Sequence, residues 1–410
     1  MATAAPSVIH AGTLLADPAQ SPKQRCSIQI KDGKIAAVAA GFIDPPPGAV
    51  LIDLKDKFVL PGLIDCHVHL TGQFGPGYRL RVVEESDVKI GLNGAYHANL
   101  TLKAGFTTVR DVGALGHPDT VFALRAAIAE GKVPGPRMLS VGTIISPTGG
   151  HGQTYGYRED VCACVQSHSG TCDGVDDCRR AVRRQVSFGA DAIKFVATGG
   201  VLSNIRAGID QQFTDDEIRT IIETAHGLGR RVAAHAHGAN GINAALRNGV
   251  DSIEHGSFLD EESIRLFLDR KAYHVPTIIA GVTALEMAKS SPDMTPAQAE
   301  KAFMVGTRIK EALARSYAAG VNIAFGTDMG VGPHGQNARE FALMVECGMK
   351  PADTVKAATV TASQLLDIAD DVGTLAPGKS ADIIAVDGNP LEDVRTLERM
   401  KFVMARGVVA

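Results

Sequence analysis

The chain of 410 residues lacks three features that mark common classes of protein. It has no apolar run of the roughly 18 residues that a membrane-spanning helix needs. It has no excess of basic residues, since the formal net charge is −4 and the pI is about 6.4, so neither nucleic acid nor an anionic membrane is an expected partner. Residues 1–6 have neither the basic start nor the apolar core of a secretory signal, which predicts a cytoplasmic protein. A secreted or periplasmic protein whose signal peptide had been removed would look the same.

The chain also has only seven cysteines, too few for a disulfide scaffold. Four of them cluster with one histidine in a predicted loop: Cys162, Cys164, His168, Cys172 and Cys178. Their spacing matches no zinc motif, so a disulfide, a structural metal and free thiols all remain open for this loop.

What the chain does contain is a repeated pattern of β-prone run, loop and helix. Such alternation is typical of parallel strands linked by helices, and it predicts an α/β protein with a (β/α)8 TIM-like barrel in residues 58–365. Capping sequences that begin at Thr214 and Asp260 mark two of the helix starts, and one long helix is expected within residues 296–319.

The two ends of the chain, residues 1–57 and 366–410, instead carry short alternating strands. The pair Asp32-Gly33 between two such runs is typical of a tight hairpin. We expect the two ends to meet in one small, discontinuous β-sandwich domain beside the barrel. The content of 45% hydrophobic and 21% charged residues agrees with a globular protein.

Two histidines, His67 and His69, end the first predicted strand of the barrel. Side chains repeat every second residue along a strand, so both imidazoles should point at one spot. Two histidines bonded to backbone carbonyls would show the same spacing. The polar residues at the ends of later strands therefore decide whether this pair belongs to a functional site or only bonds to the backbone.

Ligand-type side chains end four further β-prone runs: Lys194, His235 with His237, His255, and Asp328. In a barrel of this kind the active site lies at the C-terminal ends of the strands, where all of these residues fall. Imidazole and carboxylate groups bind Zn²⁺ well, and coordination lowers the pKa of bound water to about 7, so the set suits hydrolysis. A protonated Lys194 would repel a metal. This lysine is therefore either a structural residue paired with a carboxylate or an anionic ligand carboxylated by CO₂.

Several short motifs resemble the amidohydrolase superfamily. They are residues 61–69 (PGLIDCHVH), 193–194 (IK), 234–237 (AHAH), 253–256 (IEHG), 326–328 (GTD) and 377–383 (PGKSADI). Residues 148–152 (TGGHG) and 175–183 (VDDCRRAVR) are similar to its imidazolonepropionase-like branch, which includes Xaa-Pro and related dipeptidases and the ochratoxin-hydrolysing amidohydrolases. The resemblance covers essentially the whole chain and is strongest to bacterial amidohydrolases that act on ochratoxin A.

The resemblance implies a pair of Zn²⁺ ions held by six residues: His67, His69 and Asp328 on one ion, His235 and His255 on the other, and carboxylated Lys194 between them. Asp328 would also move the proton from the attacking water to the leaving nitrogen, which an amide needs because an amine anion is a poor leaving group. His237 would face the same cavity beyond the metal as a substrate contact, with a buried core histidine as the alternative.

Three other residues are candidate substrate contacts. His151 resembles the family's contact to the free carboxylate of the substrate. Phe213 stands near the place where several dipeptidases have a tyrosine, which favours apolar groups in the pocket. Arg206 is a candidate partner for a substrate carboxylate, and an exposed loop arginine is the alternative.

The residues and the resemblance together predict a binuclear zinc amidohydrolase that releases a C-terminal amino acid from N-acyl amino acids or dipeptides, with ochratoxin A as one candidate substrate. Alternatives are an Xaa-Pro or Xaa-Arg dipeptidase and a cyclic-amide hydrolase of imidazolonepropionase or deaminase type, although a one-metal deaminase does not need Lys194 as a bridging anion. A non-enzymatic scaffold is disfavoured because no ligand is missing. Members of the branch are often homo-oligomers, so self-assembly is expected.

Overall fold

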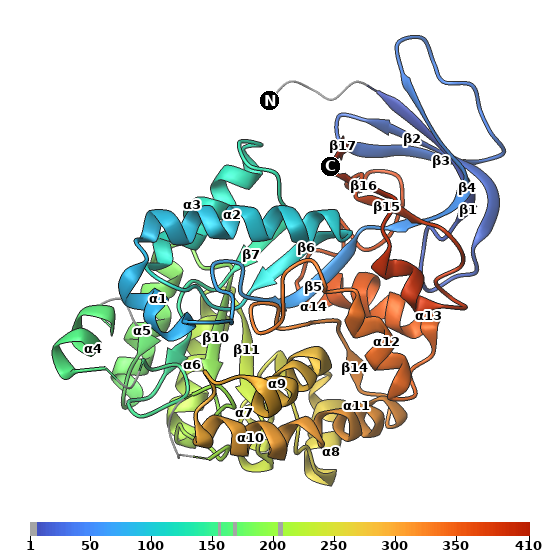
Figure 1. Ribbon diagram of the computed structural model, residues 1–410. Helices are drawn as coiled ribbons and strands as arrows, with labels where there is room; N and C mark the ends of the chain where they lie inside the picture. Colours follow the sequence, from blue (N-terminus) through green and yellow to red (C-terminus); the bar gives the residue numbers. More distant parts are fainter. Residues whose placement is uncertain (1–5, 155–156, 167–169, 204–207) are drawn as a thin grey trace.

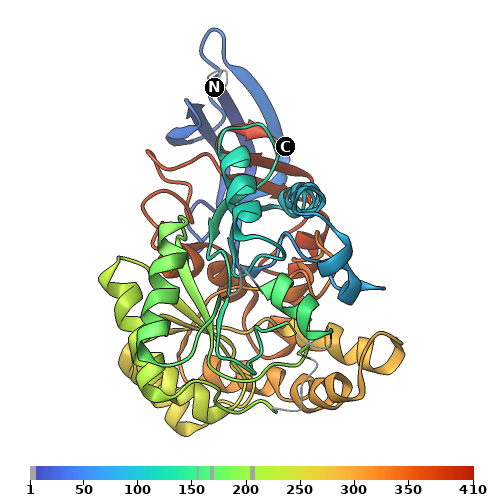
Figure 2. The same cartoon turned by 90° about the vertical axis from the view of Figure 1, so that its left-hand side faces the viewer.

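The computed structural model describes residues 6–154, 157–166, 170–203 and 208–410. Figure 1 shows a larger region in which strands alternate with helices and a smaller β-rich region that contains both ends of the chain. Figure 2, at right angles to that view, shows the β-rich region projecting from one side of the larger one. The protein is therefore α/β, as predicted.

Both ends of the chain contribute to one seven-stranded sheet with the order β17-β16-β15-β4-β1-β2-β3. Its strands are β1 (Ser7–Leu14), β2 (Lys23–Lys31), β3 (Lys34–Ala40), β4 (Val50–Pro61), β15 (Ile383–Val386), β16 (Phe402–Ala405) and β17 (Val408–Val409). Strand β4 joins the two ends because it pairs in parallel with β1 and antiparallel with β15. It also crosses the expected boundary at residue 58, so the domain limits stay a prediction.

The turn between β2 and β3 is the predicted hairpin. Asp32 and Gly33 both have positive φ, 51° and 74°, as a two-residue turn of this type requires. A Cβ atom on Gly33 would lie 2.7 Å from the carbonyl oxygen of Arg406, so this glycine also lets a C-terminal turn approach the hairpin. The prediction of a tight turn is confirmed here.

The larger region contains parallel strands in two sheets. One sheet holds β5 (Leu63–Val68), β6 (Phe106–Asp111) and β7 (Arg137–Ser140), and the other holds β8 (Ile145–Ser146), β9 (Gly170–Thr171), β10 (Ala192–Val196), β11 (Arg231–Ala236), β12 (Ser252–His255), β13 (Tyr273–Val275) and β14 (Asn322–Ile323). Backbone hydrogen bonds connect the two sheets, from Cys66 N to Phe325 O (2.9 Å) and from Asp191 N to Ser140 O (2.8 Å). The parallel strands of both sheets are therefore held side by side.

Helices connect these strands and surround them (Figures 1 and 2). They are α1 (Tyr78–Glu84), α2 (Asp87–Lys103), α3 (Pro118–Ala129), α4 (Glu159–Gln166), α5 (Val175–Ser187), α6 (Asp215–Gly227), α7 (Ala239–Arg247), α8 (Glu261–Arg270), α9 (Ile278–Ser290), α10 (Pro296–Gly306), α11 (Ile309–Ala318), α12 (Arg339–Glu346), α13 (Pro351–Lys356) and α14 (Ala362–Leu365), with a π turn at Ala357–Thr361 and a 3₁₀ turn at Val394–Glu398. Both predicted capping boxes are present, with Thr214 capping α6 and Asp260 capping α8. No helix within the described ranges is long and apolar enough to cross a bilayer.

The prediction of one long helix within residues 296–319 is wrong, because α10 ends at Gly306 and α11 begins at Ile309. Glycine is a poor helix former. A Cβ atom at Gly306 would lie 3.2 Å from Leu285 Cβ and 3.3 Å from Gly281 O, so the glycine permits a close approach of α10 to α9. Close packing between these helices and the helix break thus depend on the same residue.

The cysteines within the described residues are free thiols. The sulfur atoms of Cys172 and Cys178 lie 3.6 Å apart and are buried. Cys162 and Cys164 lie on α4. No cluster of potential metal ligands among the described residues includes a cysteine, and His168 lies outside those residues.

The buried carboxylate of Glu340 fixes the start of α9. Its two oxygen atoms accept hydrogen bonds from the backbone N–H groups of Ile278 and Ile279, both at 2.7 Å. The preceding residue, Thr277, has a positive φ of 49°, and its hydroxyl lies 2.6 Å from Nδ1 of His255. The cap of α9 consequently positions the Thr277 hydroxyl, which contacts His255 of the predicted metal site.

We expect Glu340→Gln to lower the free energy of unfolding by about 1–3 kcal/mol, because an amide has one acceptor oxygen and leaves one buried backbone donor without a partner. Denaturant unfolding measures the loss. Glu346→Gln, at a half-exposed position on α12, is the matched control and should change stability by less than about 0.5 kcal/mol. Equal losses in the two variants would contradict this role of Glu340.

Candidate metal centre

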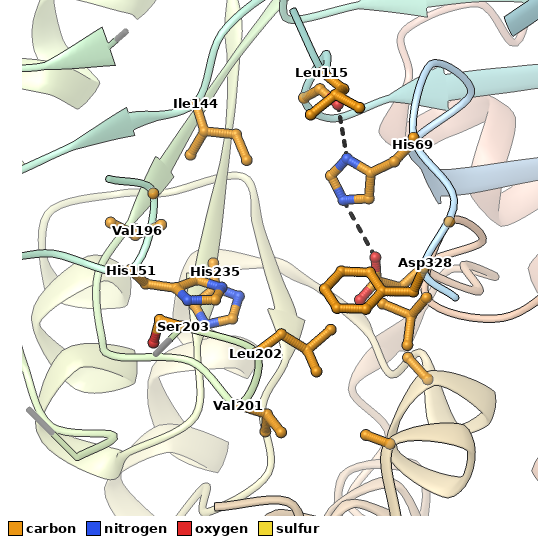
Figure 3. A pocket seen from close by; sticks show the side chains of 18 of the residues that line it. His69, Leu115, Ile144, His151, Val196, Val201, Leu202, Ser203, His235 and Asp328 are labelled. Carbon is orange, nitrogen blue, oxygen red and sulfur yellow. Dashed lines mark hydrogen bonds and ion pairs between the residues drawn. The ribbon is translucent and has the colours of Figure 1, made fainter. Parts of the chain in front are cut away.

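The six residues predicted as metal ligands all line one cavity of about 410 Å³. His67 lies on β5, Lys194 on β10, His235 on β11 and His255 at the end of β12, whereas His69 and Asp328 follow β5 and β14. Figure 3 shows His69 and Asp328 on one side of this cavity and His235 with His151 on the other. The structure therefore brings together side chains from strands that are far apart in the sequence.

The potential ligand atoms form two adjoining groups. The ligand atoms of His67, His255 and Asp328 lie within 4.8 Å of one another, and so do those of His235, His237 and His255. His255 belongs to both groups. The carboxylate of Asp328 also lies 3.2 Å from Nε2 of His69 and 3.5 Å from Nε2 of His67. The two groups therefore adjoin one another, and each is a set of side chains that could hold a metal ion.

Outer hydrogen bonds hold four of these imidazoles so that Nε2 is left for a ligand. The Nδ1 atoms are bonded as follows: His67 to Glu254 (2.7 Å), His69 to the Gly113 carbonyl (2.8 Å), His237 to Ser257 (2.8 Å) and His255 to Thr277 (2.6 Å). Histidine ligands of metals commonly have such a partner on the other ring nitrogen, because it fixes the orientation of the ring. This pattern fits a metal centre.

The charge states of four of these imidazoles also fit a cation, whereas for His69 the neighbouring Asp328 outweighs burial and raises the pKa above its usual value. Burial lowers the pKa of His67 to about 4 and that of His237 to about 3, and it holds the pKa of His235 and His255 well below the usual value. Neutral imidazole is the form that binds a metal. Burial also lowers the pKa of Lys194 to about 8, so a neutral amine is accessible near neutral pH.

Asp328 supplies the negative charge of the site. Burial alone would raise its pKa, but His67 and His69 outweigh that effect and hold the pKa below its usual value. The residue has a positive φ of 58°, and His255 has a φ of 72°. Such backbone strain in residues other than glycine concentrates at functional sites. The surrounding structure therefore holds both side chains in conformations that are unfavourable on their own.

His237 lies closer to the ligands than expected from the sequence. Its position two residues beyond His235 suggested a place above the metal, yet its ligand atom falls in the group with His235 and His255. Strand β11 ends at Ala236, and the backbone N–H of His237 donates to Thr198 Oγ1 (2.9 Å) rather than continuing the strand pairing. The sequence pattern could not reveal this local change of direction.

His151 lines the cavity, as predicted for a substrate contact. Its ring stacks on that of His235 with 4.4 Å between the ring centroids. Its Nδ1 atom is buried and has no hydrogen-bond partner in the described structure. A buried polar atom without a partner is costly, so a ligand that bonds to it would recover that cost.

The predicted substrate contact of Phe213 is not borne out by its position. Its side chain is buried in the hydrophobic core and lies 6.4 Å from the ring of Phe195, and it is absent from the described lining of the cavity. Phe213 directly precedes Thr214, the cap of α6, and packs between that helix and the strands. Arg206 lies outside the described residues.

Arg81 on α1 is a lining residue that the sequence reasoning missed. Its guanidinium donates to the carbonyl oxygen of Gln73 (3.0 Å). The helix that carries Arg81 is too short for its sequence to show clear helical periodicity. The basic residues of the described lining are Arg81, Lys194 and the histidines. Much of the remaining wall is apolar and includes Phe74, Leu115 and Leu202.

Behind the metal ligands lies a buried charge pair that the sequence also did not reveal. Arg110 Nη2 lies 2.8 Å from one oxygen of Glu254, whose other oxygen bonds to His67. Arg110 Nε also donates to the carbonyl oxygen of Cys66 (2.7 Å). Both members of the pair are almost completely inaccessible to water. This pair therefore orients the first ligand of the site.

Comparisons with known proteins agree with this geometry. Residues 58–410 match the model of the amidohydrolase family. The ochratoxinase of Aspergillus niger is 31% identical over 426 residues, covering 97% of this chain and 84% of that protein. The imidazolonepropionase of Alkaliphilus metalliredigens is 25% identical, covering 87% and 82%. A solved structure of an Xaa-Pro dipeptidase with methionine in its active site has a TM-score of 0.91 and 38% identity, covering 99% of each chain.

The matched region includes every strand that carries a potential ligand, and the relatives are aligned over most of their own length. On these grounds the chain belongs to the amidohydrolase family.

Proposed function

We propose that this protein is a binuclear, metal-dependent amidohydrolase that releases a C-terminal amino acid from N-acyl amino acids or dipeptides. The observation that carries the proposal is the pair of adjoining ligand groups that share His255 in a largely apolar cavity. The hydrogen bonds between the two parallel sheets further support a closed (β/α)8 barrel around this cavity.

In the proposed arrangement His67, His69 and Asp328 would hold one cation, His235 and His255 would hold the other, and carboxylated Lys194 would be a ligand of both. Zinc suits a set of imidazole and carboxylate ligands. The lowered pKa of Lys194, about 8, supports the modification because a neutral amine is the form that reacts with CO₂. Two such cations supply the Lewis acidity that polarises an amide carbonyl and activates water near neutral pH.

Side chains of the cavity carry out proton transfer and substrate binding. Asp328 takes the proton of the attacking water and delivers it to the leaving nitrogen. His151 and His237 offer polar contacts to the substrate, and the apolar wall accepts its acyl part. Similarity to an ochratoxinase supports ochratoxin A as a candidate substrate, cleaved to ochratoxin alpha and phenylalanine.

A second candidate is an Xaa-Pro or related dipeptidase. The 38% identity to an Xaa-Pro dipeptidase of known structure supports it. Both activities break an amide bond in front of a free carboxylate, so they share the proposed mechanism and differ in the pocket that holds the acyl part.

Metal content and amide cleavage test the proposal together. We expect two metal ions per chain and release of a free amino acid from a panel of N-acyl-phenylalanines, Xaa-Pro and Xaa-Arg dipeptides and ochratoxin A. Lys194→Ala should lose metal and activity because it removes the bridging ligand. Lys89→Ala, at an exposed position on α2, should keep both. One metal or none, with no amide cleaved by the unmodified protein, would refute the binuclear proposal.

A further inference from the structure

A second cavity of about 270 Å³ lies beside the metal cavity. The two cavities share five lining residues, which are Gln73, Phe74, Tyr78, Leu202 and Val331. These residues come from the loops that follow β5, β10 and β14 and from the start of α1. The second cavity therefore adjoins the metal cavity along a shared wall.

The wall shared by the two cavities contains several large side chains, and hydrogen bonds hold the backbone beside it. The rings of Phe74 and Tyr78 are 3.8 Å apart at their centroids. Two residues beside this wall are bonded to α10, because Gln298 Nε2 donates to the Leu202 carbonyl (2.6 Å) and Lys301 Nζ donates to the Ser203 carbonyl (2.7 Å). Figure 3 shows Leu202 between the side of the cavity with His151 and His235 and the side with Asp328. Rotation of the Phe74, Tyr78 and Leu202 side chains would open a passage between the two cavities.

The chemistry of the second cavity favours an uncharged, flexible ligand. The residues that line it and not the metal cavity are the apolar Pro76, Met287, Met294 and Pro333, together with Gly75, the uncharged polar Thr283, Ser291 and Gln298, and Asp293. Methionine side chains adapt their shape to apolar ligands. Asp293 is the only charged side chain in its described lining. A carboxylate would be repelled there, so the amino-acid half of an N-acyl amino acid would be kept in the metal cavity with Arg81.

We infer that the second cavity is a subsite for the far end of a long apolar acyl chain, so that the preferred substrates are N-acyl amino acids with extended aliphatic acyl groups. The inference rests on the proposed amidohydrolase function and adds a substrate class to it. Burial of each additional methylene group should raise kcat/KM by about three- to fourfold until the cavity is filled.

The kinetic test is a series of N-acyl-L-phenylalanines with acetyl, octanoyl and dodecanoyl groups. For the unmodified protein, kcat/KM should rise at least about 100-fold from the acetyl to the dodecanoyl compound. Met294→Trp partly fills the second cavity, so it should reduce this ratio by about tenfold or more. Met304→Trp, at an exposed position on α10, is the control and should leave the ratio unchanged. Met287→Trp fills the cavity from α9 and provides an independent variant.

A binding test does not depend on turnover. The chain contains no tryptophan, so each variant carries a single indole. Dodecanoate should change the fluorescence of Met294→Trp in a saturable manner and leave that of Met304→Trp unchanged. If no N-acyl amino acid is cleaved, the proposed function fails while the fluorescence still reports on the cavity. If the acetyl compound is cleaved without a gain from longer chains, or if dodecanoate has no effect on the buried indole, the subsite is refuted.

Discussion

Asp328→Asn is expected to lower kcat by about 10²- to 10⁴-fold, the usual contribution of a positioned acid or base. Asp328 is the only carboxylate in the described lining of the metal cavity, and it lies within 3.5 Å of two imidazoles. Asparagine has nearly the same shape but cannot accept and return a proton. The loss should therefore appear in kcat for every amide substrate, whatever the acyl group.

Metal analysis distinguishes this explanation from loss of a ligand. If Asp328→Asn keeps the metal content of the unmodified protein and still loses activity, the carboxylate acts in proton transfer. Asp119→Asn, at an exposed position on α3, should retain full activity. An Asp328→Asn variant with full metal content and kcat within tenfold of the unmodified protein would contradict a proton-transfer role.

Arg110→Met is expected to lower the free energy of unfolding by about 3–5 kcal/mol, because it leaves the buried carboxylate of Glu254 without its cation. Arg110 and Glu254 lie 2.8 Å apart and are shielded from water. Arg110 and the imidazole of His67 keep the pKa of Glu254 below its usual value although burial would raise it. The variant must either hold an unpaired charge or take up a proton.

Denaturant unfolding of the variants measures this effect. The double variant Arg110→Met with Glu254→Gln should recover part of the loss, because it removes the unpaired charge. Arg247→Met breaks the exposed pair with Glu262 and should cost less than about 1 kcal/mol. If the Arg110 and Arg247 variants lose equal stability, the buried pair contributes no more to the free energy of unfolding than an exposed pair does.

The positions that bring the candidate ligands to one cavity could be predicted from the sequence because they follow from short-range rules. His67 and Lys194 follow or end apolar runs, and parallel strands bring such positions to one edge. The turn at Asp32 and Gly33 and the cap at Thr214 depend on neighbouring residues only, and both are confirmed.

The remaining parts of the site depend on contacts between distant residues. Arg110 and Glu254 are 144 positions apart, and nothing near either residue indicates its partner. Phe213 precedes a helix cap, and only the packing of that helix decides that its ring enters the core. Short helices such as the one that carries Arg81 are too brief for periodicity to be visible.

Strand β4 has a consequence for the order in which the protein can assemble during synthesis. It leads through Gly62 directly into β5 and His67, and one of its two neighbours is β15, which begins at Ile383. The ribosome therefore makes β4 and β5 long before it makes β15, the strand that completes the pairing of β4. During that interval one edge of β4 has no partner strand, and such an edge can pair with other chains, so the nascent protein is exposed to aggregation until β15 has formed.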